Sequence, residues 1–341
     1  MDIHVAVIGA GSWGTTVAAL CCANTPTTLW ARRAELAEQI HGEHRNGDYL
    51  ADFSLPETLQ ATADLEEAVS QADLLVMGVP SLGFRDTLQQ VKPFLRPWVP
   101  IVSLSKGLEV GTKLRMSQVT QEIIPGHPVG VLTGPNLAKE ILAGDAAASV
   151  IAMDDHNVAR ALQAIFSGDM FRVYTNDDLV GCELGGVFKN VIAIASGMAD
   201  GIGTGDNTRA AVITRGLTEI SRLGVALGGD ALTFSGLAGM GDLVATCIST
   251  QSRNRFVGEQ LGKGRSIDEV IAEMKMVAEG VKTSKVVMEL ADEHGVDLPI
   301  CEEVYKVCHL GGSAEDAYRG LTRRAIASEM QGLEGARGSS R

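Results

Sequence analysis

The chain has 341 residues and a formal net charge of −13, with 45% hydrophobic and 21% charged residues. It is about twice as long as a typical domain of roughly 150 residues, so two domains with separate cores are expected. The acidic balance excludes a general nucleic-acid binder, which would carry a basic face. Eight Phe, four Tyr and three Trp are also too few for a base-stacking surface.

Cysteines, histidines and the N-terminus indicate the compartment. The six cysteines form no Cys-x-x-Cys pair and the seven histidines are scattered, so buried thiols in a reducing compartment are predicted and no metal site. A predicted strand over residues 3–8 follows the N-terminus directly, without the basic and apolar segments of a signal peptide. No run approaches the ~20 apolar residues that cross a bilayer. We therefore expect a cytoplasmic protein that is not integral to a membrane.

The first half of the chain alternates short apolar runs with helical patterns such as residues 65–72 and 84–91. Because the runs are largely apolar and do not alternate strictly, they are typical of strands buried on both faces of a parallel sheet. This alternation predicts an α/β fold with a doubly wound, mainly parallel Rossmann-type sheet. The predicted strands are residues 5–8, 27–30, 74–77, 101–104, 129–132 and 149–152.

After about residue 176 the patterns become helical, starting with a helix over residues 177–198. The glycine-rich residues 201–205 follow a helix rather than a strand, so we interpret them as a connection. We predict a dinucleotide-binding domain over residues 1–180, an all-helical substrate-binding domain over 181–331 and a flexible tail over 332–341. The further predicted helices are residues 209–227, 257–261, 267–276 and 281–294.

The first predicted strand runs into a loop with glycine at positions 9, 11 and 14. Gly9 permits a tight turn, Gly11 lets the backbone approach a pyrophosphate, and Gly14 allows helix and strand to pack closely. A helical pattern over residues 15–23 follows, so the helix N-terminus would face the anion. The loop therefore predicts a dinucleotide site. The alternative is a glycine turn without a ligand.

Two arginines follow the second predicted strand. NAD-selective enzymes usually place Asp or Glu there, roughly 20 residues beyond the loop, to hold the ribose 2′-hydroxyl. Arg32 and Arg33 stand at that position instead, and guanidinium groups suit a 2′-phosphate. The pair favours NADPH over NADH. The alternative is a solvated arginine pair that opens a surface helix.

Small residues, one lysine and one amide follow the carboxyl ends of further predicted strands. Residues 77–80 form one such turn, Lys106 lies in the next, and Gly134 and Asn136 lie in a third. Ligands of open α/β sheets bind beyond these strand ends. We therefore expect these residues around one crevice.

The predicted helix over residues 177–198 contains Lys189, the only charged residue between Glu183 and Asp200. Its apolar residues form a stripe at helical spacing, and Lys189 projects away from that stripe among small residues. An exposed lysine lying over the helix is the alternative. Isolation in an apolar segment favours burial beside a ligand, which would lower the pKa of the lysine towards catalytic usefulness.

Hydroxyl and amide side chains precede a later helix. Ser252, Arg253 and Asn254 stand at its start, and helix N-terminal N–H groups with an arginine suit a phosphate ester. The alternative is a simple N-cap.

The combination of these segments resembles the bacterial type of NAD(P)-dependent sn-glycerol-3-phosphate dehydrogenase. The likeness extends from about residue 3 to 325. It rests on residues 9–14, 105–107, 134–136, 186–190, 239–243, 252–254 and 277–280.

The resemblance implies the residues of the site. Lys189 matches the general acid/base of the family, and Asn136 stands where the family often has Ser or Thr. The implied cofactor is NADPH, with NADH as the alternative. The positions implied for the glycerol phosphate are Lys106, Gly134, Asn136, Lys189, Asp242, Ser252, Arg253 and Asn254. Those implied for the dinucleotide, beside the three loop glycines, are Ser12, Trp13, Arg32, Arg33, Lys106, Ala138, Arg253, Val277 and Glu279.

The resemblance also implies a reaction. Hydride transfer would join the nicotinamide and C2 of dihydroxyacetone phosphate, while Lys189 donates a proton to the new alkoxide. Lys106 would add positive charge there, Asp242 would orient Lys189, and Arg253 with Asn254 would hold the phosphate. A homodimer that supplies glycerophospholipid synthesis is implied. The alternatives are a β-hydroxyacid dehydrogenase, which would bind a carboxylate, and a protein that senses NADPH without chemistry.

Overall fold

The computed structural model describes residues 3–274 and 278–323. The chain divides into two compact units, Met1–Leu179 and Val180–Arg341. The tail predicted over residues 332–341 lies outside the described residues, as does the end of the helix predicted over 267–276.

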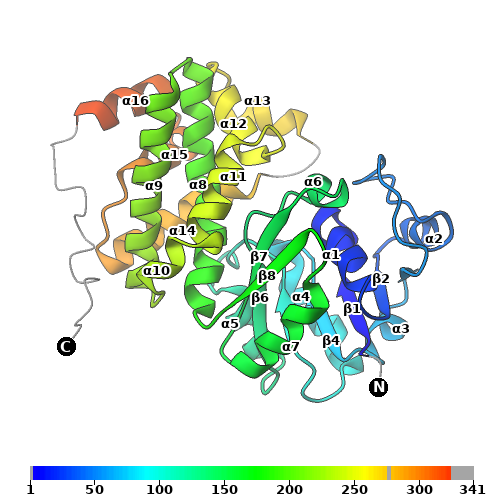
Figure 1. Cartoon of the computed structure of the whole chain (residues 1–341). Coiled ribbons are helices and arrows are strands. Elements are labelled where there is room, and N and C mark those ends of the chain that lie inside the picture. The colour runs from blue at the N-terminus through cyan, green and yellow to red at the C-terminus, as the bar shows by residue number, and fades with distance from the viewer. Residues whose placement is uncertain (1–2, 275–277, 324–341) are drawn as a thin grey trace. The chain divides into compact units, whose positions relative to one another are not determined.

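The first unit contains one eight-stranded sheet in the order β3-β2-β1-β4-β5-β6-β7-β8 (Figure 1). Neighbouring strands are parallel except β6 and β7. The predicted doubly wound, mainly parallel Rossmann-type sheet is therefore confirmed. The strands are β1 Val5–Ile8, β2 Thr27–Trp30, β3 Gln60–Thr62, β4 Leu74–Met77, β5 Ile101–Ser103, β6 Val129–Thr133, β7 Ala147–Met153 and β8 Phe171–Asn176.

Helices cover both faces of this sheet, which explains why the central strands β1 and β4 are apolar throughout. In β1, Val5 and Val7 enter one core while Ala6 and Ile8 enter the other. The first core is closed by α1, α2, α6 and α7, and the second by α3, α4 and α5. These helices are α1 Ser12–Cys22, α2 Ala34–Glu43, α3 Leu65–Val69, α4 Phe84–Val91, α5 Met116–Ile123, α6 Ala138–Leu142 and α7 His156–Phe166.

Two strands lacked the apolar run used for prediction. In β8 the residues alternate, with Phe171 and Val173 buried and Arg172 and Tyr174 exposed. The three residues of β3 are polar or small. Both strands lie at the edges of the sheet, where only part of each strand is covered. The strand predicted over residues 149–152 is longer, and it runs antiparallel to β6.

The second unit is helical in its described part, as predicted. Residues 203–205 connect α8 to α9. The helices α10, α11, α15 and α16 were not predicted. The helices are α8 Leu179–Ile202, α9 Asp206–Ala226, α10 Ala231–Phe234, α11 Asp242–Ile248, α12 Arg253–Gly262, α13 Ile267–Glu273, α14 Glu279–His294, α15 Pro299–His309 and α16 Ala314–Arg323, with a π-helical turn, η3 Leu237–Gly241, before α11.

One helix of this unit is longer and more apolar than expected. By length and composition, α8 and the segment Ala231–Ile248 would each be able to cross a membrane, so the prediction of no such run was wrong. In α8, however, 94% of the most apolar window is buried inside the protein, against 44% in the other segment. The apolar side chains of α8 thus supply the core of the helical unit.

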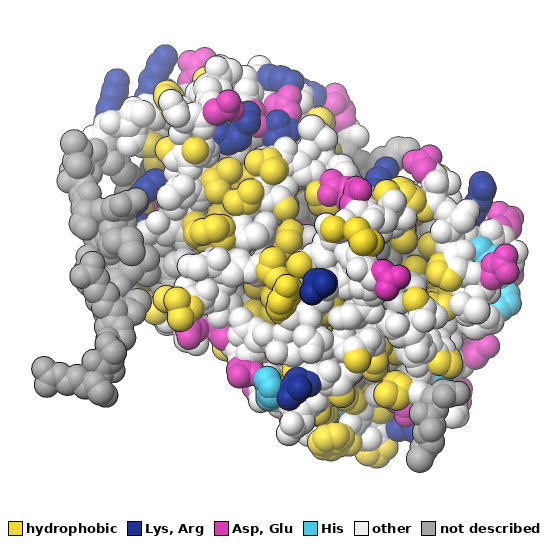
Figure 2. Space-filling view, viewed as in Figure 1, with side chains coloured by type: hydrophobic (Ala, Val, Ile, Leu, Met, Phe, Trp, Pro, Cys, Tyr) yellow, Lys and Arg dark blue, Asp and Glu magenta, His cyan; other side chains and the backbone are white. Residues whose placement is uncertain are grey.

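The surface and the thiols agree with the composition. On the face drawn in Figure 2, Lys and Arg side chains of the described residues are interspersed with Asp and Glu and form no continuous basic surface. All six cysteines are free thiols, and five of them are buried. Burial raises the pKa of the Cys247 and Cys308 thiols to about 12, so these groups stay protonated at neutral pH.

Candidate active site

The glycine loop joins β1 to α1 with little space between backbones. Gly9 has a φ of +116°, which strains other residues. A Cβ added to Gly14 would lie 2.0 Å from the carbonyl oxygen of Gly9, so that position requires glycine. Nothing lies within 4 Å of a Cβ added to Gly11. Gly9 and Gly14 therefore allow close packing within the protein. Gly11 faces open space, where a ligand can approach the protein backbone.

The start of α1 is suited to an anion. Gly11 is its N-cap, and no side chain caps the helix. The unsatisfied N–H groups and the helix dipole then favour negative charge at this end. Buried Asn46 fixes the loop by donating to Ala10 O at 2.9 Å and to Thr15 Oγ1 at 2.8 Å. Among the described residues, the buried Trp13 Nε1 has no hydrogen-bond partner. These features fit a dinucleotide pyrophosphate.

The two predicted cofactor arginines are both exposed after β2, and Arg33 is the N-cap of α2. The Arg33 guanidinium pairs with the carboxylate of Asp48, and both side chains are about half exposed. Arg33 and Asp48 also line a surface cavity of about 380 Å³ with three glutamates of α2. This acidic lining would repel a phosphate inside the cavity, so a 2′-phosphate near Arg33 would have to lie outside it.

The carboxyl ends of β5 and β6 bring three predicted residues together. Lys106 Nζ donates to Gly134 O at 2.8 Å, and Ser149 Oγ donates to Asn136 Oδ1 at 3.1 Å. Two polar atoms here, Asn136 Nδ2 and Thr133 Oγ1, are buried without a hydrogen-bond partner in the described part of the chain. Such atoms are costly unless a ligand or water satisfies them. Ala138 begins α6 directly after this turn.

In the helical unit, Lys189 is buried rather than exposed, with only 5% of its surface accessible. Its ammonium pairs with the carboxylate of Asp242 and donates to Thr246 Oγ1 at 2.7 Å. The Thr246 hydroxyl donates in turn to Asp242 O at 2.6 Å. Asp242 is 1% exposed and supplies the counter-charge of the buried ammonium. The pair is thus held by α8 on one side and α11 on the other.

The start of α12 lies beside α8. Ser252 Oγ accepts from Arg255 N at 3.2 Å, so the alternative of an N-cap holds for this hydroxyl. Asn254 Nδ2 donates to Asn190 Oδ1 at 2.9 Å, and Gly280 N donates to Asn254 Oδ1 at 2.9 Å. Arg253 is exposed in the first turn.

The remaining predicted positions lie close by in the sequence. Glu279 is half-buried at the start of α14, and Val277 lies outside the described residues. No group of three or more His, Cys, Asp and Glu side chains in residues 3–274 and 278–323 is arranged to hold a metal ion.

Three residues of these clusters were missed in the sequence. Thr246 lies four residues after Asp242, a spacing that places both on one face of α11 and was available as a signal. Asn190 directly follows Lys189. Asp48 lies in a loop after α2, and no sequence pattern links it to Arg33.

A Rossmann-type sheet with an open glycine loop, followed by a helical unit with a buried lysine–carboxylate pair, defines a nicotinamide-dinucleotide-dependent dehydrogenase. The comparison with known families is specific. The models of the NAD-dependent glycerol-3-phosphate dehydrogenase N-terminus and C-terminus match residues 4–159 and 178–319. The chain belongs to this family, and it catalyses the reversible reduction of dihydroxyacetone phosphate to sn-glycerol 3-phosphate with NAD(P)H.

Individual relatives agree over nearly the whole chain. Glycerol-3-phosphate dehydrogenase (NAD(P)+) 2 of Sphingopyxis alaskensis is 57% identical over 329 residues, covering 96% of this chain and 99% of that protein. The corresponding enzyme 1 of Mycobacterium bovis is 55% identical, covering 96% of each. The crystal structure of glycerol-3-phosphate dehydrogenase from Coxiella burnetii has a TM-score of 0.89 at 36% identity, covering 95% of this chain and 99% of that one.

Proposed function

We propose that Lys189 is the general acid/base of the reaction. The observation that carries this proposal is the buried contact of its ammonium with Asp242 and Thr246. The bound cofactor supplies the hydride, so the protein must deliver one proton to the carbonyl oxygen of the substrate. A lysine fixed by two partners is well oriented to donate that proton, and to accept it in the reverse direction.

We further propose that the start of α12 holds the substrate phosphate. Arg253 supplies charge, and Asn254 is oriented by Asn190 and Gly280. In the first unit, Lys106 and the unsatisfied amide of Asn136 are proposed as further substrate contacts. Binding energy from the phosphate then positions C2 for reaction.

The activity assay tests the proposal against its rivals. Purified protein with dihydroxyacetone phosphate should oxidise NADPH steadily, and Arg253→Ala should raise the KM for this substrate about tenfold or more through loss of a charge-assisted contact. A β-hydroxyacid dehydrogenase would prefer a carboxylate substrate, and an NADPH sensor would oxidise nothing. An unchanged KM in Arg253→Ala would refute the phosphate site.

The arginines after β2 are proposed to favour NADPH. The double variant Arg32→Ala/Arg33→Ala should raise the KM for NADPH by about tenfold or more, because two cations near a 2′-phosphate are lost. The KM for NADH should change little. As a matched control, Asp48→Asn should shift the KM for NADPH by less than about fivefold, since an exposed ion pair is worth at most ~1 kcal/mol. Equal effects of the double variant on both cofactors would contradict this proposal.

Oligomeric state, location and the domain roles remain proposals. We propose a cytoplasmic homodimer whose product enters glycerophospholipid synthesis, with cofactor binding in residues 1–180 and substrate binding in 181–331. The family resemblance supports all three. Light scattering on the purified full chain should give the mass of two chains, and a monomer mass would contradict the dimer.

A further inference from the structure

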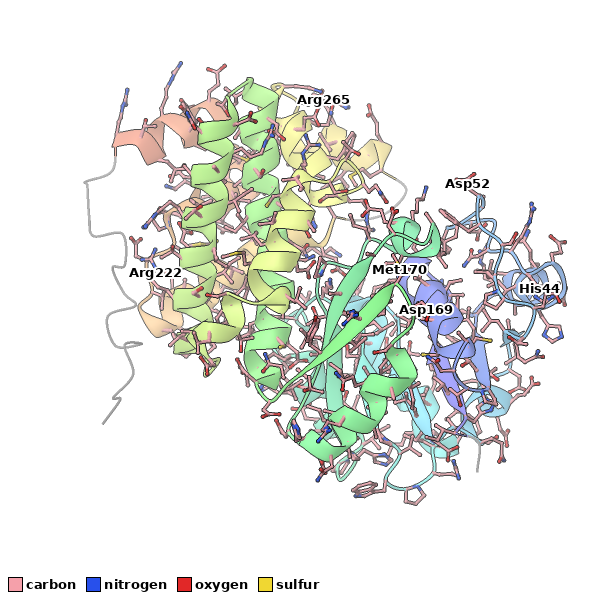
Figure 3. The ribbon with its side chains drawn as sticks, viewed as in Figure 1. His44, Asp52, Asp169, Met170, Arg222 and Arg265 are labelled. Carbon is pink, nitrogen blue, oxygen red and sulfur yellow. The ribbon has the colours of Figure 1, made fainter. Side chains whose placement is uncertain are left out.

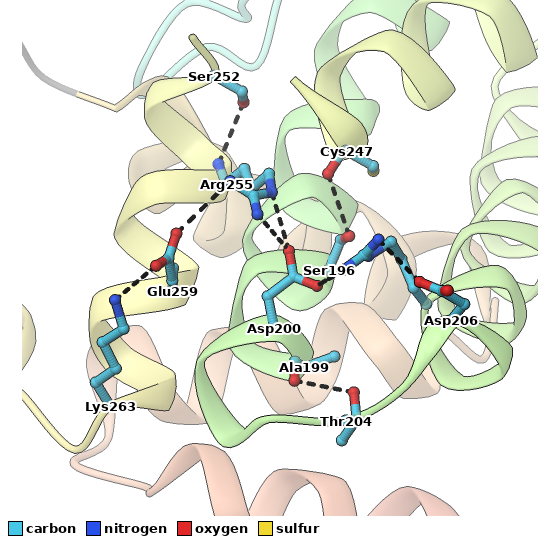
Figure 4. Close-up of polar contacts among 11 residues, drawn as sticks. Ser196, Ala199, Asp200, Thr204, Asp206, Cys247, Ser252, Arg255, Glu259 and Lys263 are labelled. Carbon is cyan, nitrogen blue, oxygen red and sulfur yellow. Dashed lines mark hydrogen bonds and ion pairs between the residues drawn. The ribbon is translucent and has the colours of Figure 1, made fainter. Parts of the chain in front are cut away.

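A buried carboxylate joins three helices near the proposed phosphate site. Asp200, on the last turn of α8, is 8% exposed in its side chain and pairs with two arginines. Its Oδ1 accepts from Arg209 of α9 at 2.6 and 2.8 Å, and its Oδ2 accepts from Arg255 of α12 at 2.9 Å (Figure 4). We call Asp200, Arg209 and Arg255 the Asp200 clamp.

The clamp acts on the first turn of α12. Arg255 is the third residue of this helix, and its backbone N–H is already held by the Ser252 hydroxyl. Both the backbone and the side chain of Arg255 are therefore fixed, directly after Arg253 and Asn254. Because the Arg255 side chain is only 16% exposed, its link to Asp200 is shielded from solvent.

Backbone contact reinforces this link. A Cβ added to Gly197 of α8 would lie 2.0 Å from Arg255 O, and one added to Gly258 of α12 would lie 2.0 Å from Ile194 O. The two helices thus touch along their backbones beside the clamp. With this contact on one side and the ion pair on the other, the first turn of α12 has little freedom to rotate or fray.

We propose that Arg255, held by Asp200, is a positioning residue that keeps the start of α12 ordered for the substrate phosphate. This inference rests on the proposed function of Arg253 and Asn254. A first turn that frays must be ordered again when the phosphate binds, which weakens substrate binding. The Lys189–Asp242 pair joins α8 to α11 rather than to α12, so proton donation is preserved when the clamp is lost.

Kinetics of the full-length enzyme test the proposal. Arg255→Gln should raise the KM for dihydroxyacetone phosphate by about tenfold or more, with kcat and the Kd for NADPH within about threefold of wild type. Arg255→Lys keeps the positive charge, so its KM should lie between the values of wild type and Arg255→Gln. If Arg255→Gln does not fold, a raised KM in Arg255→Lys tests the proposal instead. The matched control is Arg319→Gln, which breaks an exposed ion pair with Glu315 on α16 in the same unit and should leave both constants unchanged.

A fall in kcat as large as the rise in KM would mean general damage and would overturn the positioning role, as would an unchanged KM. Arg253→Ala separates this proposal from the proposed function. If Arg253→Ala raises the KM and Arg255→Gln does not, only the clamp is refuted. If Arg253→Ala has no effect, the phosphate site itself fails.

Discussion

Replacing Lys189 with alanine is expected to lower kcat for dihydroxyacetone phosphate reduction by about 10²–10⁴-fold, the usual range for loss of a positioned proton donor. The buried ammonium is the proposed source of the proton, and neither Asp242 nor Thr246 can replace it as a cation. The Kd for NADPH, measured by fluorescence titration, should change little, because the glycine loop lies in the other unit.

The same variant leaves the Asp242 carboxylate buried without its counter-charge, so reduced stability is also expected. Lys189→Ala/Asp242→Asn removes both charges and serves as the control. If the double variant regains stability but not turnover, the chemical role of Lys189 is separated from its structural role. Turnover retained in either variant would refute the assignment.

The second large effect concerns the pH dependence of stability. Glu219 of α9 is 2% exposed, and its carboxylate accepts from Ile300 N at 2.7 Å and Cys301 N at 3.1 Å at the start of α15. Burial raises the pKa of this carboxyl from 4.5 to about 7, although those two N–H groups oppose the rise. On α9, Arg222 lies three residues further on (Figure 3), and its buried Nε has no partner among the described residues.

The sign of the effect follows from the raised pKa. Below the unfolded value of 4.5 the group is protonated in both states, and above about 7 the folded state must hold a buried charge. Stability is therefore lost as the pH rises between these values, by on the order of 3 kcal/mol. Glu219→Gln cannot ionise at this position. Its free energy of unfolding minus that of wild type should therefore increase from about pH 5 to about pH 8.

Urea unfolding at several pH values measures this difference. Glu315→Gln, on the exposed face of α16, is the matched control and should track wild type at every pH. A constant difference between Glu219→Gln and wild type across the range would show that Glu219 titrates normally.

The sequence predicted the fold where local pattern and burial agree. Strands such as β1 and β4 are covered on both faces, so their apolar runs identify them. The edge strand β8 alternates instead, and its pairing with β7 depends on residues far away in the chain. The antiparallel pairing of β6 and β7 likewise has no local signal, because strand direction is a property of the whole sheet.

The site was predictable to a similar extent. The glycine loop and Lys189 have sequence contexts that limit their roles, and burial of Lys189 follows from its apolar surroundings. The partners of charged groups were harder to foresee. Asp48 and Asp200 meet their arginines only after folding, and an aspartate at a helix end or in a loop is common.

The backbone contact between α8 and α12 has a consequence for engineering. Lys189 and Asp200 are eleven residues apart, about three turns, so both lie on nearly the same face of α8 at a spacing of roughly 16 Å. The proposed proton donor and the carboxylate that anchors α12 therefore lie on one helix, and α12 packs against it at glycines. Side-chain substitutions cannot change the distance along α8 between Lys189 and Asp200. Variants selected for longer phosphorylated ketones should therefore carry changes in residues 249–251, ahead of the Ser252 cap of α12, and keep both helices intact.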